Sequence, residues 1–365
     1  MNTTYELNNL RKDSDYLNRG MRATSVVAEV FSAMVKGNEV GAIKGADKAV
    51  KYIKELGSRA ENGDFGAVAE LNTLRRFVIE TPLLQEIKLL GIFGSYQAVG
   101  WDETIEREIY KHVGEKSREQ AEGGDVVFPA IVKETYPVST FTVSGGYAVD
   151  YRRVALGDMS KENEGMEQVR IDIRNKAMRA IIQKVYEAIH NATGVKFAFE
   201  NAGLTKAGVD GVLTKIRRFG RPTVIGDYAI LSQFTPWAGY VGSINNNTIT
   251  GISEAQMNEI AQNGLLGLYN GAVLAEIENP YDETTLNAAG DDFETMLPAG
   301  LGFIVPTGAK SPIATYTRGG LTSFTGNNVK NGKIESRFDL SVGCDVAKGQ
   351  EYKIGMFLDS NISSL

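Results

Sequence analysis

The chain has 365 residues and a formal net charge of −6 at neutral pH. This length allows a sizeable core and two or three domains or subdomains, and a charged fraction of 23% gives no sign of disorder. The acidic balance disfavours sequence-specific binding to nucleic-acid phosphates. The single cysteine, Cys344, forbids an intrachain disulfide and fits a reducing compartment. Neither a signal peptide nor a membrane span is indicated by the apolar runs.

Helical patterns open the chain, over residues 26–35, 46–56 and 68–79. Glycines separate them. Helices this short are marginal alone and need a surface to pack on. The sequence therefore predicts an arm of linked helices and no separate domain over residues 1–95.

An acidic segment follows at 101–110, WDETIEREIY, and includes Asp102, Glu103 and Glu106. Two interpretations stay open. The segment is either a solvated helix face or an acidic partner for Arg152 and Arg153. Exposed ion pairs contribute little singly, although pairs repeated around an assembly would set its register.

Residues 123–149 have the composition of strands. Pro129 and Pro137 cannot donate to a β-ladder, which suits an exposed or edge hairpin. One interpretation is a hairpin within an ordinary α+β domain. The other is a projecting arm that becomes buried only against another molecule. The alternation places one set of residues opposite another, namely Phe128, Ala130 and Val132 against Val127, Pro129 and Ile131.

A long helix comes next, with Ser160 near its start and Gly194 as its stop. Its apolar residues recur every three or four positions and predict a helix of roughly 45 Å. They are Met166, Val169, Ile173, Ala177, Ile181, Val185 and Ile189.

The block 200–300 has the pattern of an α/β subdomain. It predicts a strand at 221–225, then a helix capped by Asp227 that runs through Phe234 and is stopped by Pro236. Ser253 and Gln256 form a capping box for a second helix. Residues 265–277 return to an extended, apolar composition.

The C-terminal part is strand-rich. Residues 338–346 alternate apolar and polar side chains and predict a half-buried strand, and residues 354–358 continue a related pattern. Cys344 lies on the apolar face and is interpreted as a core residue, not a nucleophile.

No constellation of residues indicates an active site, a cofactor or a metal. The segment 326–333, GNNVKNGK, has the wrong spacing for a phosphate-binding loop and is interpreted as a turn between strands. The only two histidines, His112 and His190, are interpreted as structural. The acidic loop 276–292 lacks EF-hand spacing and is interpreted as a solvated loop. A hydrolase that uses Asp291 and Asp292 remains as a distant alternative.

The order of elements resembles the major capsid proteins of tailed bacteriophages, which have the Hong Kong 97-type fold shared with encapsulins. The segments that carry the resemblance are TYPVSTFTVSGGYAVDYRRVALGD, PTVIGDYAILSQFTPWAG, RFDLSVGCDV and EYKIGMFLD. The resemblance covers residues 95–365 and rests on element order more than on signature residues. It implies an α+β fold with an N-terminal arm, an extended hairpin loop, a long spine helix, a peripheral-domain sheet and an axial α/β domain.

The resemblance also implies domain boundaries. Residues 1–95 would form a helical arm that packs on the shell, 96–150 the extended loop with its lead-in strands, 151–199 and 301–365 the peripheral domain, and 200–300 the axial domain. The partners would be copies of the chain itself in pentamers and hexamers, scaffolding and portal proteins, and packaged double-stranded DNA held non-specifically, with no membrane. The location would be the virion capsid, after assembly in the host cytoplasm.

The expected self-assembly interface combines the ribbon with the acidic and basic segments that flank it. Its residues are Phe128, Pro129, Ile131, Tyr136, Phe141, Arg152, Arg153, Asp102, Glu103 and Glu106. An exposed ribbon with apolar side chains on both faces is an aggregation hazard on a monomer. It becomes stable when each copy lies on its neighbour. An encapsulin-like compartment shell is the alternative function.

Overall fold

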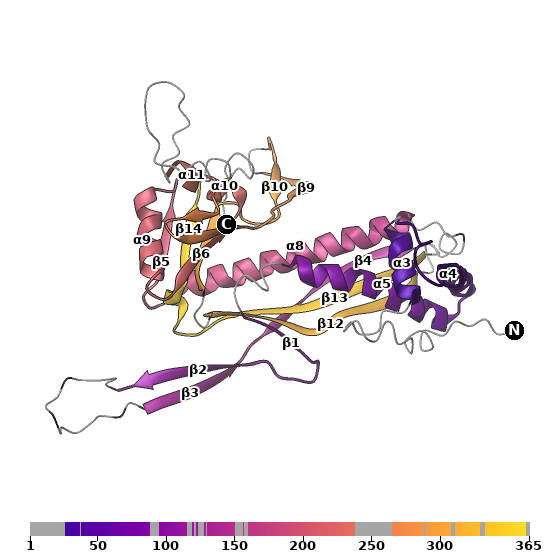
Figure 1. Cartoon of the computed structure of the whole chain (residues 1–365), viewed down its shortest axis with the longest axis horizontal. Helices are drawn as coiled ribbons and strands as arrows, with labels where there is room; N and C mark the ends of the chain where they lie inside the picture. The colour runs from indigo at the N-terminus through magenta and orange to yellow at the C-terminus, as the bar shows by residue number, and fades with distance from the viewer. Residues whose placement is uncertain are drawn as a thin grey trace. The chain divides into compact units, whose positions relative to one another are not determined.

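The computed structural model describes residues 26–36, 38–87, 95–114, 119, 122, 128, 130–149, 156, 160–237, 265–287, 290–307, 311–328 and 333–362. The fold is mixed α+β, and Figure 1 shows its elements. The chain forms two compact units, each built from three segments. Unit 1 takes in the described parts of 1–87, 142–177 and 319–341, and unit 2 takes in those of 88–141, 178–318 and 342–365.

In the described part of its N-terminal segment, unit 1 contains the helices α3 (Val26–Val35), α4 (Ala46–Glu61) and α5 (Phe65–Glu86). The three predicted helical patterns are confirmed, and each helix packs on the other two. Asp64 begins α5 because its carboxylate accepts hydrogen bonds from the N–H groups of Gly66 and Ala67, at 2.9 and 3.3 Å. The shared core includes Val30, Phe31, Tyr52, Ile53, Leu56, Leu71 and Leu74. These helices thus have a common core of their own.

The long helix α8 spans Ser160–His190 and confirms the predicted apolar stripe. It ends at His190, four residues before the expected Gly194. Within unit 1 its side chains Val169 and Ile173 pack onto strand β4 (Thr140–Val149) at Gly145. A Cβ added at Gly145 would lie 3.1 Å from Ile173, so this strand position favours glycine.

A four-stranded sheet has the order β1-β12-β13-β4, where β1 is Tyr96–Val99, β12 is Ile313–Asn328 and β13 is Lys333–Val346. The predicted strand at 338–346 is confirmed, but its polar face is not solvated as expected. Ser341 is only 4% exposed, because its hydroxyl lies 3.0 Å from that of Thr142 on β4. Cys344 is a core residue as predicted, and burial raises the pKa of its thiol to about 12.

The larger sheet belongs to unit 2 and has the order β5-β14-β11-β6-β8-β7. Its strands are β5 (Phe197–Asn201), β6 (Arg221–Gly226), β7 (Leu268–Tyr269), β8 (Ala272–Glu276), β11 (Leu301–Thr307) and β14 (Gly355–Asp359), with the short helix η1 (Glu351–Lys353) before β14. The predicted strands at 221–225 and 354–358 are confirmed, as is the extended segment 265–277. Asn270 and Gly271 join β7 to β8 with positive φ angles of 48° and 77°, which suits a tight hairpin turn.

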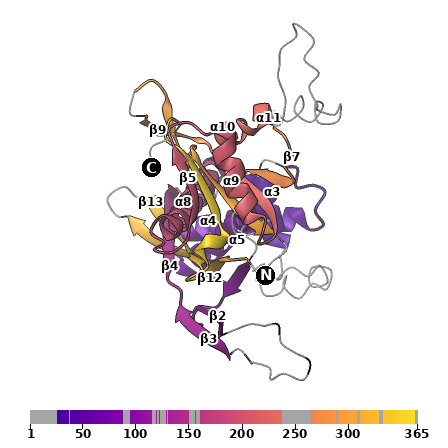
Figure 2. The same ribbon diagram turned by 90° about the vertical axis from the view of Figure 1, so that its left-hand side faces the viewer.

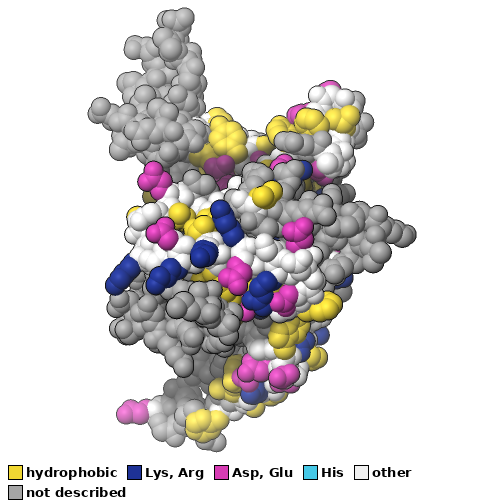
Figure 3. All heavy atoms as spheres, turned by 90° about the vertical axis from the view of Figure 1, so that its right-hand side faces the viewer, with side chains coloured by type: hydrophobic (Ala, Val, Ile, Leu, Met, Phe, Trp, Pro, Cys, Tyr) yellow, Lys and Arg dark blue, Asp and Glu magenta, His cyan; other side chains and the backbone are white. Residues whose placement is uncertain are grey.

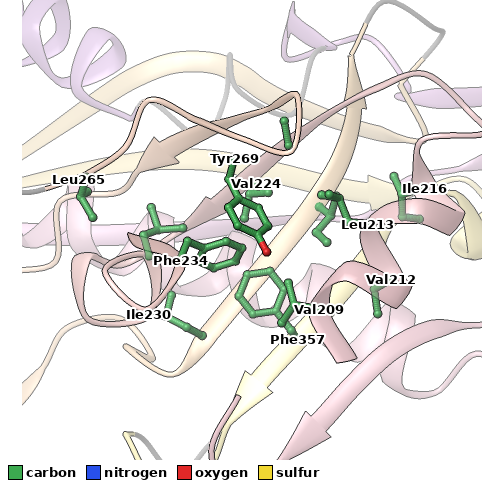
Figure 4. Close-up of a cluster of buried hydrophobic side chains, with 13 residues drawn as sticks. Val209, Val212, Leu213, Ile216, Val224, Ile230, Phe234, Leu265, Tyr269 and Phe357 are labelled. Carbon is green, nitrogen blue, oxygen red and sulfur yellow. The ribbon is translucent and has the colours of Figure 1, made fainter. Parts of the chain in front are cut away.

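Helix α9 (Lys206–Ile216) packs against this sheet and closes a hydrophobic core. Figure 4 shows its residues Val209, Val212 and Leu213 facing the ring of Phe357 on β14. The rings of Phe234 and Tyr269 meet edge to face at 5.0 Å in the same core. This core fixes the α/β block that the sequence predicted.

The helix expected after Asp227 is present but divided. Asp227 caps it as predicted and accepts a hydrogen bond from the Ala229 N–H at 2.7 Å. The helix then splits into α10 (Tyr228–Leu231) and α11 (Phe234–Trp237), so Pro236 does not stop it. Proline is tolerated there because the N–H groups of a first helical turn have no acceptor within the helix. Ser253 and Gln256 lie outside the described residues.

The acidic stretch 276–292 is a loop only in part. Its residues Tyr281–Leu286 form strand β9, which pairs antiparallel with β10 (Phe293–Thr295) just after the stretch. Over the described ranges no group of side chains is suited to hold a metal ion. Among the helices of those ranges, none has the length and apolar character to cross a membrane. Within the segment 326–333, strand β12 ends at Asn328 and β13 begins at Lys333. Residues 329–332, where the turn is predicted, lie outside the described part.

Candidate self-assembly surface

A two-stranded ribbon forms the main exposed feature of unit 2. Strand β2 (Glu106–Val113) pairs antiparallel with β3 (Ala130–Pro137), from Glu106 opposite Pro137 to Val113 opposite Ala130. The interpretation of 101–110 as a helix face is therefore wrong from Glu106 onward. The segment EREIYKHV mixes charged and apolar residues without strict alternation, and it forms a strand through its pairing with β3.

The ribbon is a sheet of two strands only, as far as the described residues go. Figures 1 and 2 show it standing away from the six-stranded sheet of the same unit. Several of its large apolar side chains are exposed, among them Tyr110 (50%), Val113 (54%), Ile131 (62%) and Val132 (47%). An isolated two-stranded hairpin is marginally stable in water. The ribbon therefore presents apolar surface that one copy of the chain leaves uncovered.

Cross-strand ion pairs lie on both faces of the ribbon. Lys111 pairs with Glu134 on one face, and Lys133 pairs with Glu108 at 2.6 Å on the other. The hydrogen bond from Lys133 to Glu108 raises the pKa of Lys133, and the hydrogen bond from Lys111 lowers the pKa of Glu134. These groups are exposed, so solvent screens them and each pair contributes little stability. They neutralise charge along the ribbon and leave its apolar residues to determine what it binds.

Arg107 anchors the root of the ribbon, by which we mean the end where Glu106 and Arg107 pair with Pro137 and Tyr136. The opposite end, toward Val113 and Ala130, is its outer part. One guanidinium nitrogen donates to the Asp345 backbone carbonyl at 2.8 Å and to its carboxylate at 3.2 Å, and the other donates to the Pro312 carbonyl at 2.7 Å. The Arg107 and Asp345 side chains are only 11% and 17% exposed. Charge-assisted hydrogen bonds with little solvent competition are stronger than neutral ones.

Tyr136 supports the same root from β3. Its hydroxyl donates to the Asp345 carboxylate at 2.7 Å and accepts from the Lys348 N–H at 3.3 Å. Burial raises the pKa of the Tyr136 hydroxyl, and the hydrogen bond to Asp345 raises it further. The ammonium of Lys348 lies 4.6 Å from the centre of the Tyr136 ring, within cation–π range.

A small apolar cluster completes the root. Ile105, Ala314 and Tyr316 are buried together, with Val99 and Val138 packed against them. The two strands of the ribbon thus leave the body of unit 2 through an ordered base. Further out on the ribbon, the described side chains of Tyr110, Val113, Ile131 and Val132 are exposed.

The expected interface residues fall in three places. Phe128 (86% exposed) and Ile131 lie at the outer part of the ribbon, whereas Tyr136 lies at its root. Phe141 is half-buried on β4. The acidic residues lie near the start of β2, with Asp102 and Glu103 in an exposed turn and Glu106 as the first strand residue. Pro129, Arg152 and Arg153 lie outside the described residues.

Sequence reasoning missed the residues that anchor the ribbon. Arg107 and Asp345 are 238 positions apart, and no local pattern links them. It also missed Tyr110 and Val113 as exposed apolar residues of the ribbon, because β2 was not predicted as one of its strands. Residues 106–113 have no strict alternation of apolar and polar side chains, so the sequence contains little signal that identifies this strand.

Comparison with known proteins gives a match at the family level. The family of the SPbeta prophage-derived putative capsid protein YonB matches residues 6–357. No match is found among curated proteins. Among solved structures, one from Mycobacterium phage Che8 is 12% identical, covers 70% of this chain and 85% of that chain, and has a TM-score of 0.44.

Two further solved structures are similar at the same level. One is from the satellite phage P4 procapsid, which includes the size determination (Sid) protein. It is 10% identical, covers 76% of this chain and 90% of that chain, and has a TM-score of 0.46. The virus-like particle from Pyrococcus furiosus is 8% identical, covers 76% of this chain and 97% of that chain, and has a TM-score of 0.43. Likeness at these scores carries no argument about function. The family match spans nearly the whole sequence, and the chain belongs to the family of the SPbeta prophage-derived putative capsid protein YonB.

Proposed function

We propose that this capsid-family chain is a major capsid protein that self-assembles into the icosahedral shell around the double-stranded DNA genome of a tailed phage. The observation that carries the proposal is the β2–β3 ribbon, whose root is ordered and whose outer part exposes apolar side chains. A shell of identical chains gives each ribbon a neighbouring copy to lie on.

The energetics favour such an arrangement. Burial of apolar surface contributes about 25 cal/mol per Å², and the exposed Ile131, Val132, Val113 and Tyr110 offer such surface on every copy. The anchored root lowers the entropic cost of binding, because the base of the ribbon is already ordered. Many modest contacts per subunit then make assembly cooperative.

The remaining assignments extend the proposal. Residues 96–150 are the extended loop, 151–199 and 301–365 the peripheral domain, 200–300 the axial domain, and 1–95 an arm that packs on the shell. Copies meet in pentamers and hexamers, with scaffolding and portal proteins as further partners. Assembly takes place in the host cytoplasm, and the acidic chain contacts the packaged DNA only non-specifically. The chain has a structural role and not an enzymatic one.

Electron microscopy of the purified full-length chain tests the function. We expect closed shells of uniform size above a critical protein concentration. A homogeneous monomer at high concentration, under all salt and pH conditions tried, would contradict the proposal. Particles isolated from producing cells distinguish the alternative, because a phage capsid contains genomic DNA and an encapsulin-like compartment contains a cargo protein.

A further inference from the structure

Charge is strongly segregated along the sequence of unit 2. Between Arg221 and Lys310 the chain has no lysine, arginine or histidine. The same stretch carries ten carboxylates, at Asp227, Glu254, Glu259, Glu276, Glu278, Asp282, Glu283, Asp291, Asp292 and Glu294. The stretch before it, 196–221, is basic, with Lys196, Lys206, Lys215, Arg217, Arg218 and Arg221 against Glu200 and Asp210. One α/β block thus joins a basic part to an acidic part.

The acidic part includes an uncovered apolar sheet face on the β9–β10 hairpin. Tyr281 is 53% exposed, Leu286 55% and Phe293 43%. The rings of Tyr281 and Phe293 lie 6.4 Å apart, and Phe293 is opposite Leu286 in the register. In Figure 3 the hairpin lies at the upper right, where hydrophobic and acidic side chains are mixed. Among the described elements, only β9 and β10 make up this sheet.

The carboxylates of the hairpin are unevenly neutralised. Glu294 lies directly opposite Asp282, and like charges in this position destabilise a strand pair. Hydrogen bonds from the Thr284 hydroxyl and N–H lower the pKa of Asp282, and the charge of Arg179 adds to the effect. Asp291 accepts a hydrogen bond from the Asn287 amide at 2.8 Å. Glu294 takes part in none of the ion pairs identified in the described residues, so the hairpin keeps an excess of negative charge.

The basic part gathers at the C-terminal end of α9. Here Lys215, Arg217, Arg218 and Arg221 are all exposed, and we call these four residues the basic α9 end. Arg217 donates to the Asn270 carbonyl at 2.8 Å, and the Lys215 ammonium lies over the Phe197 ring at 5.3 Å. The sequence has no carboxylate from residue 211 to 226. Favourable placement of cations at a helix C-terminus accounts for some of this charge, but not for Arg221 on β6.

We propose that the β9–β10 hairpin of one copy docks on the basic α9 end of the next copy. Figures 1 and 2 show α9 and the hairpin at separate places on unit 2, so each copy can offer its hairpin to one neighbour and its basic end to another. A two-fold contact between two hairpins would bring like charges together. The charge pattern therefore favours a head-to-tail contact, which closes into a ring when the rotation between copies divides a full turn evenly. This inference rests on the proposed function and specifies one contact within the shell.

Charge reversal tests the contact. The variant Arg218→Glu with Arg221→Glu, and the variant Asp291→Lys with Glu294→Lys, should each lower the yield of shells by about tenfold, because each places like charges together. The four changes combined in one chain should restore most of the yield. Lys161→Glu with Lys184→Glu on α8 is the matched control, since both lysines are exposed and belong to neither the hairpin nor the basic α9 end. Circular dichroism of each variant checks folding.

A disulfide test identifies the pairing directly. Arg218→Cys with Glu294→Cys in one chain, assembled and then oxidised, should give a ladder of linked chains longer than dimers. Each single cysteine variant should give no ladder. Full assembly of both reversed variants, no recovery in the combined variant, or the absence of a ladder from intact shells would overturn the proposal and leave the capsid function standing. A parent chain that forms no particles and gives no ladder would overturn both.

Discussion

At the scale of single residues, Asp359 at the end of β14 is a buried carboxylate of unit 2 with several hydrogen-bond donors around it. It is 3% exposed and accepts hydrogen bonds from the N–H groups of Gly203 and Asn361, at 2.9 and 3.0 Å, and from the Gln233 amide at 3.1 Å. Burial opposes its ionisation, but these bonds prevail and lower the pKa of Asp359. The carboxylate thereby ties β14 to the segments that follow β5 and α10.

Substitution of Asp359 should destabilise the isolated subunit in a pH-dependent way. Asp359→Ala should lower the free energy of unfolding at pH 7 by about 2–3 kcal/mol, because buried donors lose a charged acceptor. Asp359→Asn keeps one acceptor and should cost less. The folded-state pKa lies below the unfolded value of about 3.9, so the stabilisation is present above that pH and is lost as pH falls through the folded-state pKa. Urea unfolding at pH 7 and at pH 3 measures this, and an equal loss at both values would contradict it.

Residues differ in how far the sequence alone predicts their role. Asp227 was predicted as a helix cap because its hydrogen-bond donor, Ala229, lies two positions away. Asp359 was not predicted, because Gly203 and Gln233 lie 156 and 126 positions before it. Local contacts leave a local pattern in the sequence, whereas contacts created by the tertiary fold do not.

At the scale of elements, the same distinction separates α8 from β2. The apolar stripe of α8 repeats over many turns, so its helix was predicted with the correct start at Ser160. Strand β2 has eight residues of mixed charge and no long period. Its conformation depends on pairing with β3, and the sequence does not show that pairing. The two faces of β13 show a further limit, since a polar residue such as Ser341 is buried when its hydroxyl finds a partner.

The outer part of the ribbon should be dispensable for folding and required for assembly. We would replace residues 111–132 by a short Asn-Gly turn, which keeps Arg107, Tyr136, the buried Ile109 and the paired ends Tyr110 and Lys133. The subunit should remain folded and lose less than about 1 kcal/mol of stability, because the described residues of β2 and β3 in this part pair mainly with each other. Shells should no longer form.

Electron microscopy and urea unfolding measure the two effects. The matched control keeps the ribbon and replaces Lys111 and Glu134 by Thr, which removes one exposed ion pair and should leave assembly almost unchanged. An unfolded subunit after replacement of 111–132 would show that the outer part of the ribbon belongs to the core. Normal shells would show that other surfaces are sufficient for assembly.

At the scale of the whole molecule, we expect the apolar side chains to become buried in two stages, some when the chain folds and others when copies associate. The six-stranded sheet and its helices form a complete core in one copy, with Phe234, Phe303 and Phe357 almost fully buried. The ribbon and the β9–β10 hairpin keep apolar side chains exposed in the same copy. Folding therefore completes the first set of contacts, and association with other copies completes the second. The family match supports this division, because a capsid protein functions only as an assembly.

Hydrogen exchange should resolve these two stages in one experiment. In the free subunit, amides of β2 and β3 should exchange quickly, because the ribbon is exposed and marginally stable alone. In assembled shells, their exchange should slow by at least about tenfold as a neighbouring copy covers the ribbon. Strand β11 is the internal control, because β6 and β14 flank it in every copy and its exchange should be slow in both states. Equal exchange of the ribbon in the free and assembled chains would mean that it stays uncovered in the shell, and the apolar side chains of Ile131 and Val132 would then need another partner.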